Sequence, residues 1–216
     1  MLPLKNDRRL RKTPFLTVII VLVNLFVFGF ELSLPPAEFR EFISTWGFTP
    51  RVMSEVNFTR GFLTIFSSMF IHGGLLHVAG NMLYLWIFGG SIEEKLGPFR
   101  FLTFYLLAGM AGALSQYFIF PTSQMPMIGA SGAVAGVLGA YMVLFPESRI
   151  LTAVLFFYII RLVYLPAWFL LGFWVFIQFM HGLLSLGVAA SGGVAWFAHI
   201  GGFFAGVFLV KILKKP

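Results

Sequence analysis

The chain of 216 residues contains no cysteine, a single aspartate and few charges of any kind. Without cysteine it can form no disulfide bond, thiolate metal site or cysteine nucleophile. Charged residues make up 11% of the sequence and hydrophobic residues 59%, whereas ordinary globular domains have about 25% charged residues. A chain of this size cannot bury so much apolar surface away from water. The composition therefore excludes a soluble globular protein and predicts an integral membrane protein.

Six apolar stretches are predicted to cross the bilayer, for which a helix needs about 20 residues. They cover 15–30, 75–90 with an upstream extension at 62–71, 101–120, 130–145, 166–188 and 194–213. We therefore predict an all-α polytopic membrane protein, a six-span helix bundle over 15–213. The segment 150–164 is apolar, but it is short and contains Arg161. It is interpreted as interfacial or re-entrant, with a seventh span as the alternative.

The basic residues predict the orientation of the bundle. Twelve of the fifteen lysines and arginines precede the first span, follow the last, or lie between spans two and three or four and five. With six spans these positions share one side, which should be the cytoplasm. We thus expect a cytoplasmic tail at 1–14, an extracytoplasmic first loop at 31–60 and a cytoplasmic end at 214–216. The net charge of +7 then reflects topology, and no nucleic-acid partner is expected.

Polar side chains at membrane depth are rare and are hypotheses about function. His77 and Asn81 are four residues apart and share a helix face, in a segment that opens with His72 and two glycines. Ser131 starts the fourth stretch, and His199 lies early in the sixth, each among small residues. These three clusters are the candidate functional positions.

Small residues on two spans could bring a serine and a histidine together. Gly132, Gly136 and Ala140 recur every four residues on the fourth span, and Gly202 and Gly206 lie beside His199 on the sixth. Faces of this kind let helix backbones approach closely in lipid. Ser131 could then hydrogen-bond His199, and a serine beside a neutral imidazole is the minimum for an activated nucleophile.

The same residues also have interpretations that involve no catalysis. A lone serine in a glycine-rich span, or a lone histidine in a span, usually serves packing. His181 has no partner motif and is interpreted as a core residue. The small-residue runs alone fit a transporter or channel equally well. The joint presence of serine, asparagine and two histidine motifs favours an enzyme.

At these residues the sequence resembles the rhomboid family of intramembrane serine proteases. The resemblance covers nearly all of the chain after residue 15 and rests on three motifs in order. They are His72-Gly-Gly-Leu-Leu-His77-Val-Ala-Gly-Asn81, Gly129-Ala-Ser131-Gly132, and Ala198-His199-Ile-Gly-Gly202 with Gly206. The fold that it implies is the six-span bundle with both termini cytoplasmic.

The resemblance also implies a reaction, a serine endopeptidase that cleaves transmembrane proteins near the membrane surface. Ser131 would be the nucleophile and His199 the general base. Asn81, His77 and the backbone N–H of Ser131 would form the oxyanion site. The supporting residues that it implies are His72, Gly129, Gly132 and Gly202. Transmembrane substrates and the lipid bilayer are the expected partners, with no cofactor and no metal. The alternative is a non-proteolytic relative that binds transmembrane segments.

Two positions depart from the pattern of many family members. Leu63-Thr64 stand where a Trp-Arg pair is common, and Ala135 stands where an aromatic residue often packs on the catalytic histidine. Phe203 and Trp196 are candidates to hold His199 instead.

The acidic residues limit the mechanism. Asp7 lies in the predicted tail, and the glutamates fall in loops or at span ends. No acid is therefore expected to complete a Ser-His-Asp/Glu triad, and we predict a two-residue dyad. The small size and the absence of a transit-type extension favour a bacterial inner membrane.

Overall fold

A computed structural model describes residues 1–187 and 193–214 of the chain. Two of the predicted segments extend beyond these residues, the end of the fifth stretch at 188 and the C-terminal end at 215–216. The described helices are α1 (Phe15–Ser33), α2 (Pro36–Trp46), α3 (Phe58–Ser68), α4 (Leu75–Leu96), α5 (Pro98–Ile119), α6 (Ser131–Leu144), α7 (Ala167–Gly187) and α8 (Trp196–Leu213), and the strands are β1 (Leu2–Asn6), β2 (Arg149–Phe156) and β3 (Ile159–Pro166). Val52–Val56 adds one π-helical turn.

Among the described residues, five helices are long and apolar enough to cross a membrane: α1, α4, α5, α7 and α8. The fourth predicted span corresponds to α6, a shorter apolar helix of 14 residues. At 1.5 Å per residue it is about 21 Å long, against a hydrocarbon core of about 30 Å. Other helices surround it, and nine of its residues, from Ala133 to Tyr141, are buried. The helical, polytopic architecture predicted from the sequence is confirmed.

One detail of the predicted spans is wrong. The segment 62–71 does not extend the second span, because α3 ends at Ser68 and the chain turns before α4 begins at Leu75. The segment 150–164 does not form the seventh span that was the alternative, and its interfacial position stays a prediction. It forms most of an antiparallel hairpin, in which Arg149 pairs with Pro166 and Phe156 with Ile159. A hairpin satisfies its backbone groups between the strands and so needs no helix of spanning length.

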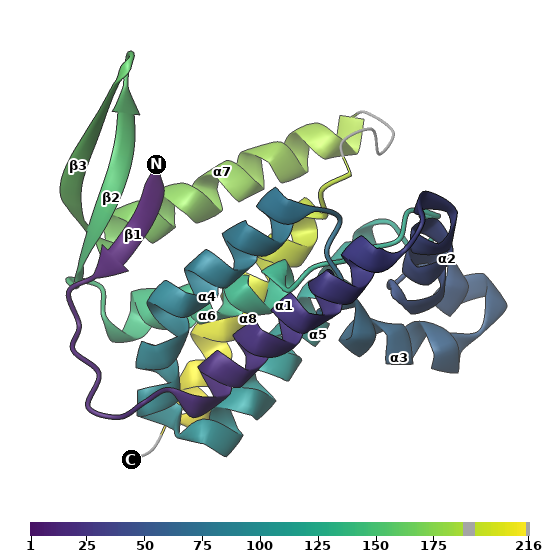
Figure 1. Cartoon of the computed structure of the whole chain (residues 1–216), viewed down its shortest axis with the longest axis horizontal. Helices are drawn as coiled ribbons and strands as arrows, with labels where there is room; N and C mark the ends of the chain where they lie inside the picture. Colours follow the sequence, from purple (N-terminus) through teal and green to yellow (C-terminus); the bar gives the residue numbers. More distant parts are fainter. Residues whose placement is uncertain (188–192, 215–216) are drawn as a thin grey trace.

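The N-terminal segment is attached to this hairpin. β1 pairs antiparallel with β2, so the sheet has the order β1-β2-β3. The Ser148 hydroxyl donates to Asp7 at 2.6 Å, and the Arg8 guanidinium lies 3.6 Å from the centre of the Phe145 ring. The predicted tail, 1–14, therefore contains a strand that packs beside the bundle, as Figure 1 shows.

Glycines set the contact between α6 and α8 at the centre of the bundle. A β-carbon at Gly202 would overlap the carbonyl of Gly132, and one at Gly206 would overlap the carbonyl of Gly136. The two backbones thus touch along a stripe where larger side chains cannot fit. The close approach predicted from the small residues is confirmed.

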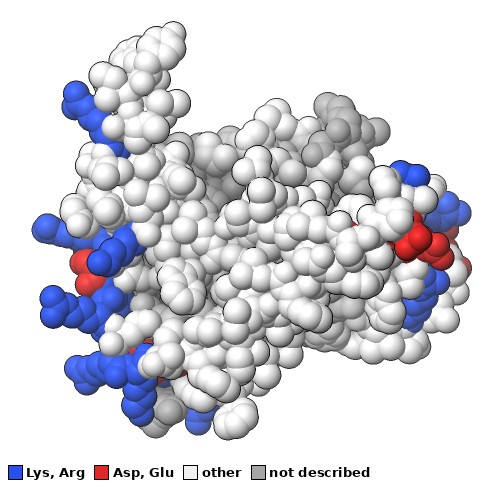
Figure 2. Space-filling view, viewed as in Figure 1, with Lys and Arg blue, Asp and Glu red and all other residues white. Residues whose placement is uncertain are grey.

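Charged side chains gather at the two ends of the molecule. Figure 2 shows lysines and arginines concentrated at the end that carries the sheet and both chain termini, and a mixed group of both signs over α2 and α3. The surface between them is uncharged in this view. This distribution suits a protein whose middle lies in lipid and whose ends reach the headgroups.

Candidate active site

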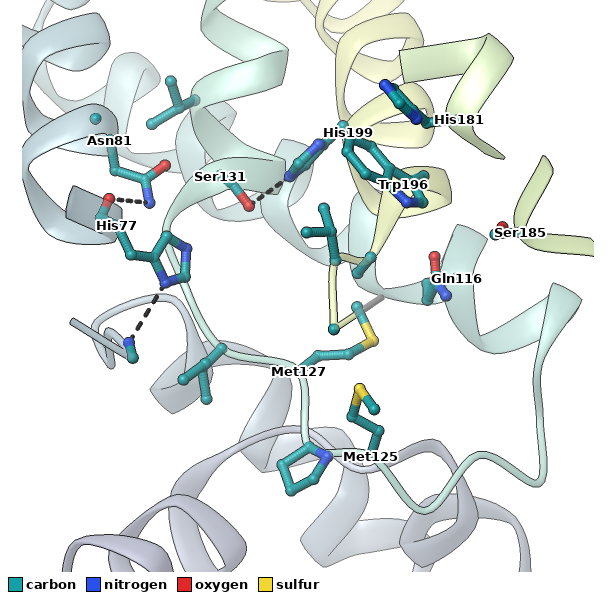
Figure 3. Close-up of a pocket in the computed structure, with 18 of the residues that line it drawn as sticks. His77, Asn81, Gln116, Met125, Met127, Ser131, His181, Ser185, Trp196 and His199 are labelled. Carbon is teal, nitrogen blue, oxygen red and sulfur yellow. Dashed lines mark hydrogen bonds between the residues drawn. The ribbon is translucent and has the colours of Figure 1, made fainter. Parts of the chain in front are cut away.

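Ser131 and His199 meet where α6 and α8 begin. Ser131 is the first residue of α6, and His199 lies in the first turn of α8. His199 Nε2 and Ser131 Oγ are 2.8 Å apart, a hydrogen-bonding distance. The glycine contacts between α6 and α8, Gly132 with Gly202 and Gly136 with Gly206, hold the two helices close enough for this contact. The structure therefore brings together the serine and histidine singled out in the sequence (Figure 3).

The other ring nitrogen of His199 contacts a residue that the sequence analysis missed. His199 Nδ1 lies 2.8 Å from Oε1 of Gln178, a buried side chain of α7. The signal that could have found Gln178 is its polarity in an apolar span, where such a residue is unusual. His199 thus has a hydrogen-bond partner on each ring nitrogen.

Two tryptophans flank the His199 ring, although Ala135 replaces the expected aromatic. Trp196 meets the imidazole edge-on, with centroids 6.1 Å apart and planes at 88°. Trp174 of α7 lies 6.0 Å away at 36°. Of the two candidates from the sequence, Trp196 contacts the ring, whereas Phe203 packs on Trp174. Trp174 was not anticipated.

His77 and Asn81 lie one helical turn apart on α4 and line the same cavity as Ser131. The N–H of Gly73 donates to His77 Nδ1 at 3.4 Å, which leaves Nε2 as the nitrogen that carries the proton. The Asn81 amide donates to the His77 carbonyl at 3.1 Å with one of its two N–H groups. Each side chain therefore has an N–H available to a group in the cavity.

Gly129 shapes the chain just before Ser131. Its φ is +115°, and a β-carbon there would come within 2.6 Å of His77 Nε2. Its N–H donates to the Ser68 carbonyl at 2.9 Å, which ties this turn to α3. Only glycine meets both demands, the positive φ and the close approach.

His72 lies behind His77, outside the cavity lining. Its side chain is fully buried, and its ring meets that of His77 edge-on with centroids 5.0 Å apart. Its backbone N–H donates to the Glu31 carboxylate at 3.1 Å. Burial, and next the nearby His77, lower the pKa of His72 to about 4. His72 is therefore a neutral packing partner at ordinary pH.

The cavity has a volume of about 900 Å³ and runs from the start of α4 to the start of α8. Its wall includes the segment between α5 and α6, with Met125 and Met127, and side chains of α7.

His181 was interpreted as a core residue, and this is wrong. It is exposed, lines the cavity and stacks on Trp196 with centroids 4.6 Å apart.

The two buried glutamates have partners away from Ser131 and His199. Glu31 accepts from the His72 backbone, as described above. Glu93 accepts from the N–H groups of Leu16 and Thr17 and from the Thr17 hydroxyl at 2.7–2.9 Å, at the start of α1. Within residues 1–187 and 193–214, no group of three or more His, Asp or Glu side chains is placed to hold a metal ion.

Comparison with known proteins places these residues in a family. The rhomboid domain model matches residues 59–216, which include all three motifs. Rhomboid protein 1, mitochondrial, of Saccharomyces cerevisiae is 33% identical over 134 residues, 60% of this chain and 36% of the relative. Rhomboid protease GluP of Bacillus subtilis is 42% identical over 79 residues, 37% of this chain and 15% of the relative.

A third relative is the presenilin-associated rhomboid-like protein, mitochondrial, of Bos taurus, 39% identical over 85 residues, 38% of this chain and 22% of the relative. The matched regions thus span about a third or less of the length of these relatives. The family model covers well over half of the chain, and the family includes a protease. The chain is a polytopic membrane protein that belongs to the rhomboid family.

Proposed function

We propose that this chain is an intramembrane serine endopeptidase with Ser131 as nucleophile and His199 as general base. The observation that carries the proposal is the 2.8 Å contact between His199 Nε2 and Ser131 Oγ at the edge of a large cavity. A base within hydrogen-bond reach of a hydroxyl is the geometry that nucleophilic catalysis requires.

The reaction has two halves. His199 Nε2 takes the hydroxyl proton of Ser131 as Oγ attacks the carbonyl carbon of the scissile peptide bond. The tetrahedral intermediate collapses, the C–N bond breaks, and His199 gives the proton to the leaving amine. Water then attacks the acyl-enzyme with His199 again as base, which releases the carboxylic acid and returns the proton to Ser131.

The negative oxygen of each tetrahedral intermediate needs hydrogen-bond donors. The donors that we assign are the Asn81 amide, His77 Nε2 and the backbone N–H of Ser131. In the first turn of a helix, backbone N–H groups have no partner within the helix and carry the positive end of its dipole. The cavity is partly enclosed by apolar side chains, and donors act strongly where the local dielectric is low.

The substrates that we propose are transmembrane proteins, which reach the site from the bilayer. α6 is too short to cross the whole hydrocarbon core, and the turn before Ser131 is hydrogen-bonded to Ser68 of α3. We therefore place Ser131 inside the bilayer, near the membrane surface on the side of α2 and α3. A substrate would therefore be cut near that membrane surface. The positive-inside distribution supports N- and C-termini on the cytoplasmic side, and the membrane that we propose is a bacterial inner membrane.

The proposal is tested by cleavage of a model transmembrane substrate in liposomes. We expect Ser131→Ala and His199→Ala each to abolish cleavage while the purified variants keep the helical content and thermal unfolding of the parent. Ser185→Ala is the matched control, because this serine lines the same cavity but donates to the Gly182 carbonyl at 2.6 Å. It should cleave like the parent.

Cleavage by Ser131→Ala at the parent rate would overturn the proposal. No cleavage by the parent, together with saturable binding of the substrate, would instead support a non-proteolytic protein that binds transmembrane segments.

A further inference from the structure

We propose that Gln178 is a positioning residue that holds His199 in the tautomer able to accept the proton of Ser131. This inference rests on the proposed function and extends the expected Ser-His dyad to a Ser131-His199-Gln178 relay of hydrogen bonds. It starts from the two contacts of the His199 ring, 2.8 Å from Nε2 to Ser131 Oγ and 2.8 Å from Nδ1 to Gln178 Oε1.

The orientation of the Gln178 amide decides which way the proton lies. Its nitrogen, Nε2, donates to the Trp174 carbonyl at 3.4 Å, one turn earlier on α7. The oxygen therefore faces His199, and an amide oxygen can only accept a hydrogen bond. A flipped amide would direct an N–H at Nδ1 and lose the bond to Trp174.

The tautomer of His199 follows from this orientation. Because Oε1 accepts, Nδ1 must carry the N–H, and the neutral ring then has its lone pair on Nε2. That lone pair is what a general base presents to the Ser131 hydroxyl. In Ser-His-Asp triads the acid has this task of fixing the tautomer. Here the oxygen of an uncharged amide has the same task.

The surroundings of His199 add no competing acceptor for Nδ1 among the described residues. The ring is flanked by Trp174 and Trp196, His181 stacks on Trp196, and His77 lines the same cavity. Gln178 is only 7% exposed, so water cannot readily replace its oxygen.

Three variants test the role of Gln178. Gln178→Met keeps an unbranched side chain of similar length but removes the acceptor. Gln178→Glu keeps an acceptor of the same shape. Gly172→Ala, at a position on α7 with open space around it, controls for changes in that helix. The tautomer is read from the imidazole 15N shifts of His199 in the Ser131→Ala background, where activity has no part.

We expect His199 to carry its proton on Nδ1 in the parent, in Gln178→Glu and in Gly172→Ala, and to shift toward Nε2–H in Gln178→Met. In active protein, Gln178→Met should lower kcat by about tenfold, the equivalent of one net hydrogen bond, with KM nearly unchanged. Gln178→Glu should recover most of that loss.

An unchanged tautomer in Gln178→Met would overturn the inference, as would an Nε2–H tautomer in the parent. Equal losses of kcat in Gln178→Met and Gln178→Glu would assign Gln178 a packing role only. The two tautomer outcomes are measured in Ser131→Ala protein and do not depend on cleavage, so failure of this inference is distinguishable from failure of the proposed function.

A second, independent observation concerns the tip of the β2–β3 hairpin. Phe157 and Tyr158 form its turn and are 81% and 98% exposed. Phe157 has φ of +55°, a left-handed conformation that favours glycine or asparagine in hairpin turns. The turn thus holds an aromatic side chain at a position where the backbone disfavours it.

One face of the hairpin is apolar and uncovered. Residues paired across the strands share a face, and so do pairs two steps apart. Four residues on one face are each at least 60% exposed: Leu155, its partner Ile160, Leu162 and Tyr164. On the opposite face, Ile150 and Thr152 are fully buried. The sheet therefore uses one face near its base for packing and leaves the other free.

We propose that this face and the turn insert into the headgroup region of the bilayer and bind anionic lipid. The hairpin leaves the bundle at its basic end and reaches out to one side (Figures 1 and 2). The charged residues on the three strands are Lys5, Arg149 and Arg161, all cations. Apolar and aromatic side chains beside cations are typical of surfaces that lie in a membrane interface.

The absence of cysteine makes a direct test possible with single-cysteine variants that carry an environment-sensitive fluorophore. Tyr158→Cys places the probe at the turn, and Glu147→Cys places it at an exposed site beside the base of the hairpin. In phosphatidylglycerol-containing liposomes, the Tyr158→Cys probe should be quenched by lipid-attached quenchers and shielded from aqueous iodide. The Glu147→Cys probe should show the reverse.

Iodide quenching of the Tyr158→Cys probe without lipid quenching would overturn the assignment. Shielding that disappears as the protein is diluted in excess lipid would assign the face to a second copy of the chain instead. Equal lipid quenching in purely zwitterionic liposomes would remove the anionic-lipid part of the proposal.

Discussion

Gly129 lies directly against the imidazole of His77, so close that a β-carbon at Gly129 would come within 2.6 Å of His77 Nε2. This contact joins the turn before α6 to the start of α4. It thereby fixes the distance between the residue that we assign as nucleophile and the side chains that we assign as oxyanion donors. The backbone of one segment is packed on the functional side chain of another.

Gly129→Ala should therefore damage the site more than the fold. The new methyl group would displace the His77 ring, and the positive φ would add strain of about 1 kcal/mol. We expect cleavage to fall at least tenfold while the protein still unfolds cooperatively. Cleavage kinetics and thermal unfolding of the same preparation provide the check. Parent-like activity in Gly129→Ala would show that the His77 position is not critical.

Asn81→Ala should lower kcat by about 10²–10³, the usual effect of removing one oxyanion donor. Asn24→Ala is the matched control, because the Asn24 amide makes an equivalent bond to the Ile20 carbonyl at 2.7 Å in a buried part of α1. Asn24→Ala removes a similar hydrogen bond far from the cavity and should leave kcat unchanged in folded protein. Equal losses of kcat in both variants would mean that Asn81 acts only through stability.

Gly202→Ala should separate α6 from α8, because its β-carbon would overlap the Gly132 carbonyl. We expect a loss of about 1–3 kcal/mol in the free energy of unfolding, which is typical of overpacking. Activity should fall as well, since the two helices carry Ser131 and His199. Gly172→Ala on α7 has open space around it and should be neutral. A neutral Gly202→Ala would contradict the close helix contact.

His72 should make stability depend on pH. Burial lowers its pKa to about 4 in the folded protein, below the ordinary value of about 6.5 in an unfolded chain. Its contribution to stability is therefore present above pH 6.5 and lost as the pH falls toward 4. His72→Gln cannot titrate, so its unfolding temperature should drop less between pH 7 and pH 4.5 than that of the parent. An identical drop would exclude this role.

Much of the architecture was predictable because its causes are local in the sequence. A long apolar run specifies a span without reference to its neighbours. Small residues at a four-residue spacing specify a close helix contact, and Gly132, Gly202 and Gly206 make that contact. Ser131 and His199 follow from these contacts, because each lies at the start of one of the two helices.

The surroundings of His199 were not predictable in the same way. Gln178 and Trp174 come from α7, and nothing local in the sequence fixes the rotation of that helix against α8. Gln178 is unusual as a polar residue in an apolar span, but this does not tell which helix it faces, and Trp174 by itself fits an interfacial position. Only the packing of α7 beside α8 turns Gln178 into a hydrogen-bond partner and Trp174 into a neighbour of the imidazole ring.

The hairpin was missed for a related reason. The segment 150–164 is apolar along most of its length, and such a run does not by itself separate a buried helix from a strand. The turn has Phe157-Tyr158 in place of the glycine or asparagine that usually indicates a hairpin. Pairing with β1, about 150 residues earlier in the sequence, is a long-range contact that hydropathy does not encode.

The most direct test of the central assignment is the site at which a fluorophosphonate probe attaches to the purified protein in liposomes. The probe reacts with a serine hydroxyl that an adjacent base has activated, and mass spectrometry locates the adduct. The dyad predicts one adduct, on Ser131, which disappears in His199→Ala and persists in Ser185→Ala. Labelling of Ser185 or another serine, or labelling of Ser131 that is undiminished in His199→Ala, would contradict it.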